Sequence, residues 1–348
     1  MFNTQTVFVV GAGASCELGF PSGVGLKRQI ASFLNVKHDR RGQLLVEDDE
    51  LREAFTLLGH QAGLRQWYAA SRRVSAGMAI APSIDNYLHT HSENLLFARC
   101  GKLAITSKIL AGEKKSPLYT PGEGIPDLAH ETLEKSWLPR FAWQLVVDVS
   151  KHEAARIFDK LHFIIFNYDR CVEQYLYYAL QVYYDVTKEE AANILNRVNF
   201  YHPYGTVGRL PWQHGDGDAV AFGADPNAAE LLTLSDGIRT FTESVEKDGS
   251  LSAARDAYLD CKQVLFLGFS FGKQNMQLLC KPRSEVGQYV PLGRRVYGTS
   301  FGVSDDDQGV FQKRIQRSWP ARHPQDSIHL HNLTCAALFD RYSQSIAG

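Results

Sequence analysis

The sequence has few cysteines, and none of them are spaced as metal or redox pairs. Its six cysteines lie at positions 16, 100, 171, 261, 280 and 335 of 348 residues, and no two form a C-x-x-C pair. This excludes a zinc ribbon or a C-x-x-C redox site built in the usual way. Six scattered cysteines are also too sparse for a disulfide scaffold. We interpret them as reduced, mostly buried residues of a cytoplasmic protein.

The sequence also lacks a strong net charge and long apolar runs. Its formal net charge is −1, which gives no global reason for binding nucleic acid or an anionic membrane. No stretch approaches the ~20 apolar residues of a membrane span. The apolar run near the N-terminus, Val7 to Val10, has four residues and no basic segment before it. The pattern of a signal peptide is therefore absent.

What the sequence does contain is an alternation of short apolar runs and helical patterns. A length of 348 residues suits one large domain with an insertion, or two domains. The buried strands that we expect lie at 7–10, 161–166, 198–202, 264–267, 294–299 and 328–331, with a further candidate at 219–222. Strands that alternate with helices predict an α/β fold with a Rossmann-like parallel sheet flanked by helices.

A large helical insertion is expected after the first strand and helix. Residues 35–159 show helical patterns at 48–58, 63–74, 84–110 and 127–149, and no clear strand. Residues 1–34 and 160–348 would then form the Rossmann-like domain. An insertion at the carboxyl edge of a sheet would enclose a ligand crevice there.

The first candidate motif, Gly11-Ala12-Gly13-Ala14-Ser15, directly follows the first strand. Glycines at such a turn let the backbone approach a pyrophosphate, whose charge is then stabilised by N–H groups at a helix start. The usual dinucleotide fingerprint has a third glycine where this chain has Cys16. A simple tight turn is the alternative interpretation.

Three further motifs follow later strands in the same way. Asn167 and Asp169 come after the strand at 161–166, where Asp169 could instead cap the next helix. His202 ends the strand at 198–202, and an isolated histidine beside aromatic residues can equally be a packed one. Gly268 and Ser270 follow the strand at 264–267, and a plain strand-to-helix turn explains them equally well.

Together, the four motifs occupy the same structural position in the same order, and this combination resembles the sirtuin family. Sirtuins carry a Gly-Ala-Gly-x-Ser turn, an Asn-x-Asp segment, a histidine-glycine segment and a Gly-x-Ser turn. The segment 19–23, which includes Pro21, also resembles the family's loop over the cofactor, and the segment 83–88 resembles one common in bacterial sirtuin-like proteins. The resemblance covers about residues 7–30 and 160–300.

The resemblance is greatest to sirtuin-like NAD-degrading proteins of bacterial antiphage defence. Asn167-Tyr168-Asp169 followed by Glu173 is similar to their motif, as is Gly-Phe-Ser-Phe at 268–271, and the zinc cysteines of the deacetylases are missing. One departure concerns the histidine, since Tyr204 stands directly before Gly205 where the family has histidine. His202 lies two residues earlier, which keeps its side chain on the same face of a strand. His214, followed by Gly215, is the alternative, and we favour His202.

The resemblance implies an NAD hydrolase that releases nicotinamide and ADP-ribose without a metal. Asn167 would hold a ribose hydroxyl or the attacking water, and His202 would act as general base. Asp169 would orient the nicotinamide side or support the positive charge that develops on the ribose. The residues expected to bind NAD are Gly11, Ala12, Gly13, Ala14, Ser15, Pro21, Asn167, Asp169, Gly268 and Ser270. Control by homo-oligomerisation or by a partner ATPase or nuclease is expected. The alternatives are a scaffold that binds NAD or ADP-ribose without catalysis and, less favoured, an NAD-dependent protein deacylase.

Overall fold

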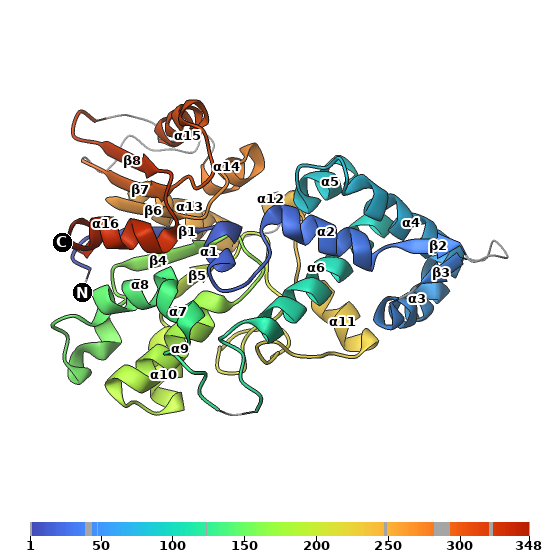
Figure 1. The fold of residues 1–348 in the computed structure, drawn as a ribbon, viewed down its shortest axis with the longest axis horizontal. Coiled ribbons are helices and arrows are strands. Elements are labelled where there is room, and N and C mark those ends of the chain that lie inside the picture. Colours follow the sequence, from blue (N-terminus) through green and yellow to red (C-terminus); the bar gives the residue numbers. More distant parts are fainter. Residues whose placement is uncertain are drawn as a thin grey trace.

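The computed structural model describes residues 2–38, 44–46, 48–122, 124–246, 249–281, 293–319 and 323–347. Its centre is a six-stranded, all-parallel sheet, which lies in the half of the molecule that carries both termini (Figure 1). The strands are β1 (Thr6–Val10), β4 (Leu161–Ile165), β5 (Asn199–Tyr201), β6 (Gln263–Leu267), β7 (Arg295–Thr299) and β8 (Ser327–His331). The predicted α/β class with a Rossmann-like parallel sheet is confirmed.

The strand order reverses at a defined point of the sheet. The order is β5-β4-β1-β6-β7-β8, so the chain builds outward from β1 on one side and then returns to build on the other. Doubly wound sheets bind ligands at the carboxyl ends of the strands where this reversal occurs. Val10 pairs with both Ile165 and Leu267, so the carboxyl ends of β1, β4 and β6 are level.

Alternation along β1 explains why the sheet is covered on both faces. Val7 and Val9 belong to one core cluster, whereas Phe8 and Val10 belong to the other. A strand buried on both sides is therefore a continuous apolar run in the sequence. Helices α8 (Trp137–Val146), α9 (Cys171–Tyr184) and α16 (Cys335–Ala347) pack in the second cluster, and α13 (Gly249–Asp260), α14 (Lys273–Leu279) and α15 (Asp305–Ser318) in the first.

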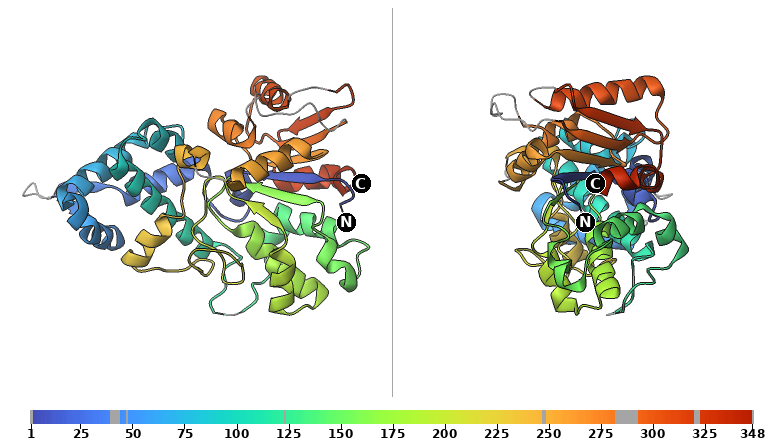
Figure 2. Two further views of the ribbon diagram at one scale, coloured as in Figure 1. Left: turned by 180° about the vertical axis from the view of Figure 1, so that it is seen from behind. Right: turned by 90° about the vertical axis from the view of Figure 1, so that its left-hand side faces the viewer.

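The other half of the molecule is a lobe of helices (Figures 1 and 2). Its members are α2 (Gly23–Phe33), α3 (Asp49–Ala62), α4 (Leu64–Gly77), α5 (Ile84–Thr90), α6 (Leu95–Lys115), α11 (Ala228–Ser235) and α12 (Phe241–Glu246). Helix α6 contacts α2, α4, α5 and α11, and it is buried around most of its circumference. Such a helix is the centre of its lobe.

This lobe does not coincide with the segment 35–159 that was expected to form it. Within that segment, α7 (Glu131–Lys135), α8 and the short η1 (Lys151–Arg156) lie beside the sheet, where α8 packs against α16 and α9. The ring of Phe141 lies 4.8 Å from that of Phe8 on β1, so the apolar face of α8 is buried against the sheet. Conversely, α11 and α12 follow β5 in the chain and complete the lobe.

Several local predictions differ from the structure. Residues 35–159 contain an antiparallel pair of short strands, β2 (Val36–His38) and β3 (Leu44–Val46), where no strand was expected. The candidate strand at 219–222 is a loop with one isolated bridge, between Arg209 and Ala219. The expected helix at 84–110 is two helices, because Asn94 caps α6 by accepting a hydrogen bond from the Phe97 N–H (3.1 Å).

Three helices were not predicted: α1 (Ala12–Cys16), α10 (Lys188–Leu195) and α15. Among the described residues, no helix is long and apolar enough to cross a lipid bilayer.

Candidate functional site

The loops that follow β1 and β6 touch each other through their backbones. A Cβ atom on Gly11 would lie 2.6 Å from the Gly268 carbonyl oxygen, and one on Gly268 would lie 2.1 Å from the Ala14 nitrogen. Gly268 also has a φ of 58°, which favours glycine. The glycines that the sequence suggested for approach to a pyrophosphate are thus required for the approach of the two loops to each other.

Part of the expected phosphate-binding turn is already hydrogen-bonded. The N–H of Gly11 donates to the Leu267 carbonyl (2.9 Å), that of Gly13 to the Gly268 carbonyl (3.0 Å), and that of Ala14 to the Gly11 carbonyl (2.9 Å). These three N–H groups hold the turn together, so a phosphate there would have to be bound chiefly by the remaining donors of the segment 11–15.

Asn167 connects the end of β4 to the turn after β1. Its Nδ2 donates to the Gly11 carbonyl (3.1 Å) and to the Ser15 hydroxyl (2.8 Å). The side chain is 5% exposed, and its Oδ1 has no hydrogen-bond partner in the described structure. A buried acceptor without a partner is costly and calls for a ligand or water. Asn167 therefore offers one unused oxygen at the centre of the sheet edge.

Asp169 lies two residues further along the same loop. Burial raises the pKa of its carboxyl to about 6, although hydrogen bonds from Cys171 and Ser15 oppose that rise. One of its oxygens accepts from the Cys171 N–H (3.3 Å) at the start of α9. Asp169 thus has the capping contact that was its alternative role, and its carboxyl also titrates near neutrality, as acid–base groups in active sites do.

His202 follows β5 and forms a buried pair with a residue of α9. Its Nε2 lies 2.7 Å from Oε1 of Glu173, whose side chain is 1% exposed. Because a carboxylate can only accept, the shared proton is on Nε2, and Nδ1 is the atom that carries a lone pair when the imidazole is neutral. Neither Nδ1 of His202 nor Oε2 of Glu173 has a partner among the described residues.

Glu173 belongs to the motif that follows β4, but its pairing with His202 is the contact that the sequence analysis did not predict. A carboxylate within the mostly apolar first turns of a helix is the signal that could have revealed it, since buried charges need partners. His214, the alternative histidine, lies on an exposed loop, where its backbone N–H donates to Asn196 Oδ1 (2.7 Å). The structure brings His202 to the sheet edge and does not bring His214 there.

Two tyrosines connect this edge to its surroundings. The hydroxyl of Tyr168, between Asn167 and Asp169, donates to Asp85 on α5, so the helical lobe contacts the β4 loop directly. Tyr204, which directly precedes Gly205, is buried and donates to Asn275 Oδ1 (2.9 Å). Asn275 in turn donates to the exposed Ser270 hydroxyl (3.4 Å).

A buried ion pair holds α6 against the same loop. Arg170 donates to Glu113 at the end of α6 through Nε (3.0 Å) and Nη2 (2.5 Å), and both side chains are at most 1% exposed. Arg170 also donates to the carbonyls of Gly208, Val220 and Ala221, and Glu113 accepts from the Gly223 N–H. The pair therefore joins the lobe, the start of α9 and the segment 208–223.

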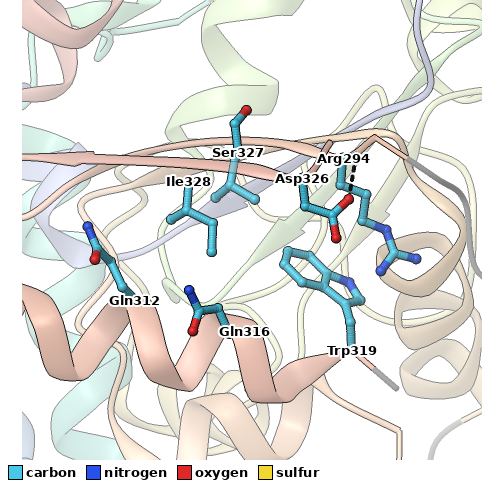
Figure 3. A pocket seen from close by; sticks show the side chains of 8 residues that line it. Arg294, Gln312, Gln316, Trp319, Asp326, Ser327 and Ile328 are labelled. Atoms are coloured by element: carbon cyan, nitrogen blue, oxygen red, sulfur yellow. Dashed lines mark hydrogen bonds between the residues drawn. The ribbon is translucent and has the colours of Figure 1, made fainter. Parts of the chain in front are cut away.

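The candidate residues differ in exposure. Ser15, Asn167 and Asp169 are each at most 5% exposed, whereas Ala12, Gly13 and Ser270 are exposed, so a ligand contacts the three buried side chains only if the structure around them opens. Pro21 is not part of this cluster of buried groups, because its loop lines a separate cleft against α6. Figure 3 shows a further hollow, which lies at the amino ends of β7 and β8 and therefore at the opposite edge of the sheet. Gln312 and Gln316 of α15 line it together with Trp319.

Comparison with protein-family models and with curated proteins found no match. In the described ranges, no cluster of three or more histidine, cysteine, aspartate or glutamate residues is arranged to hold a metal ion.

The raised pKa of Asp169 predicts how the stability of an Asp169→Asn variant depends on pH. Its pKa is 3.8 in the unfolded chain and about 6 in the folded one, so the ionised form is disfavoured by folding. The contribution of this carboxyl to the free energy of unfolding of the wild type is fully present below about pH 4, and it is lost as the pH rises through about 6. Asparagine carries no such penalty, so the variant should gain on the order of 3 kcal/mol relative to the wild type between pH 4 and 7.

Urea denaturation of both proteins at a series of pH values measures this difference. A stability difference that stays constant from pH 4 to 7 would contradict the assignment of a raised pKa to Asp169.

Proposed function

We propose that this chain is a sirtuin-like NAD hydrolase that cleaves the bond between nicotinamide and ribose. The observation that carries the proposal is that Asn167 contacts the turn after β1, where the strand order reverses, and that the buried His202–Glu173 pair lies at the same carboxyl edge of the sheet, after β5. Asn167 and His202 each keep a buried polar atom that has no partner among the described residues. These atoms fit groups that bind a polar substrate and a water molecule.

In the proposed reaction, the C1′–N bond breaks and its electron pair leaves with nicotinamide, which becomes neutral. The oxygen of a water molecule bonds to C1′, and Nδ1 of His202 takes the proton that this water loses. Asn167 Oδ1 accepts from a ribose hydroxyl or from the water. Asp169, when ionised, stabilises the positive charge that develops on the ribose, in a site from which bulk water is excluded. Glu173 positions the imidazole.

Uncontrolled hydrolysis would deplete the NAD of the cell, so the activity calls for a trigger. We propose a cytoplasmic antiphage effector that is controlled by self-assembly or by a partner chain, such as an ATPase or a nuclease. The burial of Ser15, Asn167 and Asp169 supports such control, because the structure around these side chains must open before a substrate can contact them.

The second candidate function is a scaffold that binds NAD or ADP-ribose without catalysis. A scaffold would bind NAD and leave it intact. A deacylase, the least favoured interpretation, would remove the acetyl group from an acetyl-lysine peptide.

Single substitutions of the two histidines test the proposed function. Purified proteins are incubated with NAD, and nicotinamide release is followed by chromatography. The wild type should release nicotinamide, His202→Ala should lose roughly 10²–10⁴-fold in turnover because its base is gone, and Glu173→Gln should lose less. Glu173→Gln should lower kcat while leaving the KM for NAD nearly unchanged, since Glu173 acts through His202.

His214→Ala is the matched control and should keep full turnover, because this histidine lies on an exposed loop. Loss of turnover in His214→Ala alone would reverse the assignment. If the wild type binds NAD tightly and leaves it intact, the result would support the scaffold instead.

A further inference from the structure

A cleft lies beside the packed helices α2 and α6, next to the Gly19–Pro21 loop, and residues of both helices line it. Its volume is 470 Å³, within the range of about 300–1,000 Å³ that is common for small-molecule sites. Gln29, Ser32 and Phe33 line it from α2, whereas Lys108, Gly112 and Lys115 line it from α6. The cleft is more polar than apolar, which favours a polar ligand over a lipid or an apolar helix.

Lys108 is half-buried in this cleft and fixed in place. Its Nζ lies 4.1 Å above the centre of the Phe33 ring, a cation–π arrangement that holds the ammonium group at one point. Burial lowers the pKa of Lys108, and the nearby Asp48 and Glu50 oppose this effect. Within the described structure, both carboxylates are engaged elsewhere, by the Leu51 N–H and the Ser107 hydroxyl, and neither forms an ion pair with Lys108.

Lys115 provides a second cation on the same side of α6. It lies seven residues after Lys108, which in a helix is two turns and about 10 Å along one face. Within the described residues it makes no ion pair either. Asp48 is the one acidic residue among those described that lines the cleft, and its side chain caps α3. Two ammonium groups without a carboxylate partner in the described ranges therefore face one hollow.

We propose that this cleft binds a phosphate-bearing small molecule, with the phosphate between Lys108 and Lys115. Lysine is a compact point charge that suits phosphate oxygens. The exposed hydroxyl and amide groups of Ser32 and Gln29 lie on the opposite wall and can hydrogen-bond the rest of the ligand. This site goes beyond the proposed hydrolase and does not depend on it.

The cleft is physically connected to the candidate site through α6. Gly112 packs against the Phe20 ring so closely that a Cβ atom at this position would lie 3.0 Å from the nearest ring carbon. The next residue, Glu113, forms the buried ion pair with Arg170 beside Asp169. A ligand bound in this cleft would therefore contact α6 next to Glu113, and through the Glu113–Arg170 pair it would affect the position of the loop that carries Asn167 and Asp169.

Calorimetric titration of the full chain at constant ionic strength tests the proposal with three probes: inorganic phosphate, ADP and adenosine. The wild type should bind ADP, and adenosine should bind at least about tenfold more weakly because it lacks phosphate. The Lys108→Met, Lys115→Met double variant should weaken ADP binding about tenfold or more, whereas Lys108→Arg, which keeps the charge, should retain most of the affinity. Inorganic phosphate that binds as tightly as ADP would identify free phosphate as the ligand.

Lys114→Met is the matched control, because Lys114 lies on the same helix but pairs with Asp225 (2.8 Å) outside the cleft. It should leave ADP affinity unchanged. No binding of ADP or phosphate to the wild type, equal affinity in the double variant, or an equal loss in Lys114→Met would overturn the proposal. ADP binding that is kept in Asn167→Ala and lost in the lysine double variant would locate the ADP in the cleft, whether or not the chain hydrolyses NAD.

Discussion

Asn167→Ala should lower NAD turnover by about 10²–10³-fold, the usual cost of losing one polar group that acts in the transition state. The change removes the unpartnered Oδ1, which we assign to the ribose or the water. It also removes the hydrogen bonds to Gly11 and Ser15, so a loss of stability of about 1–3 kcal/mol should accompany it. Turnover and urea denaturation are measured on the same preparation.

Asn196→Ala is the matched control for this loss of stability. Asn196 also donates twice through Nδ2, to the carbonyls of Ala192 (2.8 Å) and Trp212 (3.0 Å), but it lies outside the candidate site. It should lose similar stability and keep its turnover. If Asn167→Ala were destabilised and yet fully active, Asn167 would be a structural link between two loops and no more.

Arg170→Met should reduce the free energy of unfolding by on the order of 3–5 kcal/mol. The substitution keeps an apolar stem of similar length but leaves the carboxylate of Glu113 buried without its cation. The carbonyls of Val220 and Ala221 also lose their donor. Natural domains are stable by only about 5–15 kcal/mol, so this single change should remove a large part of the total.

Two comparisons keep this prediction testable by urea denaturation. Adding Glu113→Gln to Arg170→Met should restore part of the stability, because the uncompensated charge is then gone. Lys135→Met breaks an exposed ion pair with Glu131 and should leave the denaturation midpoint unchanged. An Arg170→Met variant as stable as the wild type would show that the buried pair contributes nothing to holding α6 on the sheet.

The sequence by itself determined the class of the fold and the edge of the sheet at which polar residues gather. The apolar runs of β1, β4 and β6 are buried on both faces, so their pattern is local and directly readable. The motifs at Gly11, Asn167, His202 and Gly268 each follow such a run, and parallel strands bring their carboxyl ends to one edge. The NAD chemistry assigned to them rests on resemblance and awaits the experiments above.

Only the tertiary structure decided which groups meet and which helices cover which part. Glu173 and His202 are 29 residues apart, and Glu113 and Arg170 are 57 apart, so no local pattern could pair them. Helix α8 lies beside the sheet, whereas α11 and α12 complete the helical lobe. A helical pattern shows that each of these helices has an apolar face, but it does not show which part of the protein that face contacts. Likewise, only the structure shows that Gly11 and Gly268 allow the backbones of two distant turns to contact each other. The space around a residue depends on parts of the chain that are far away in the sequence.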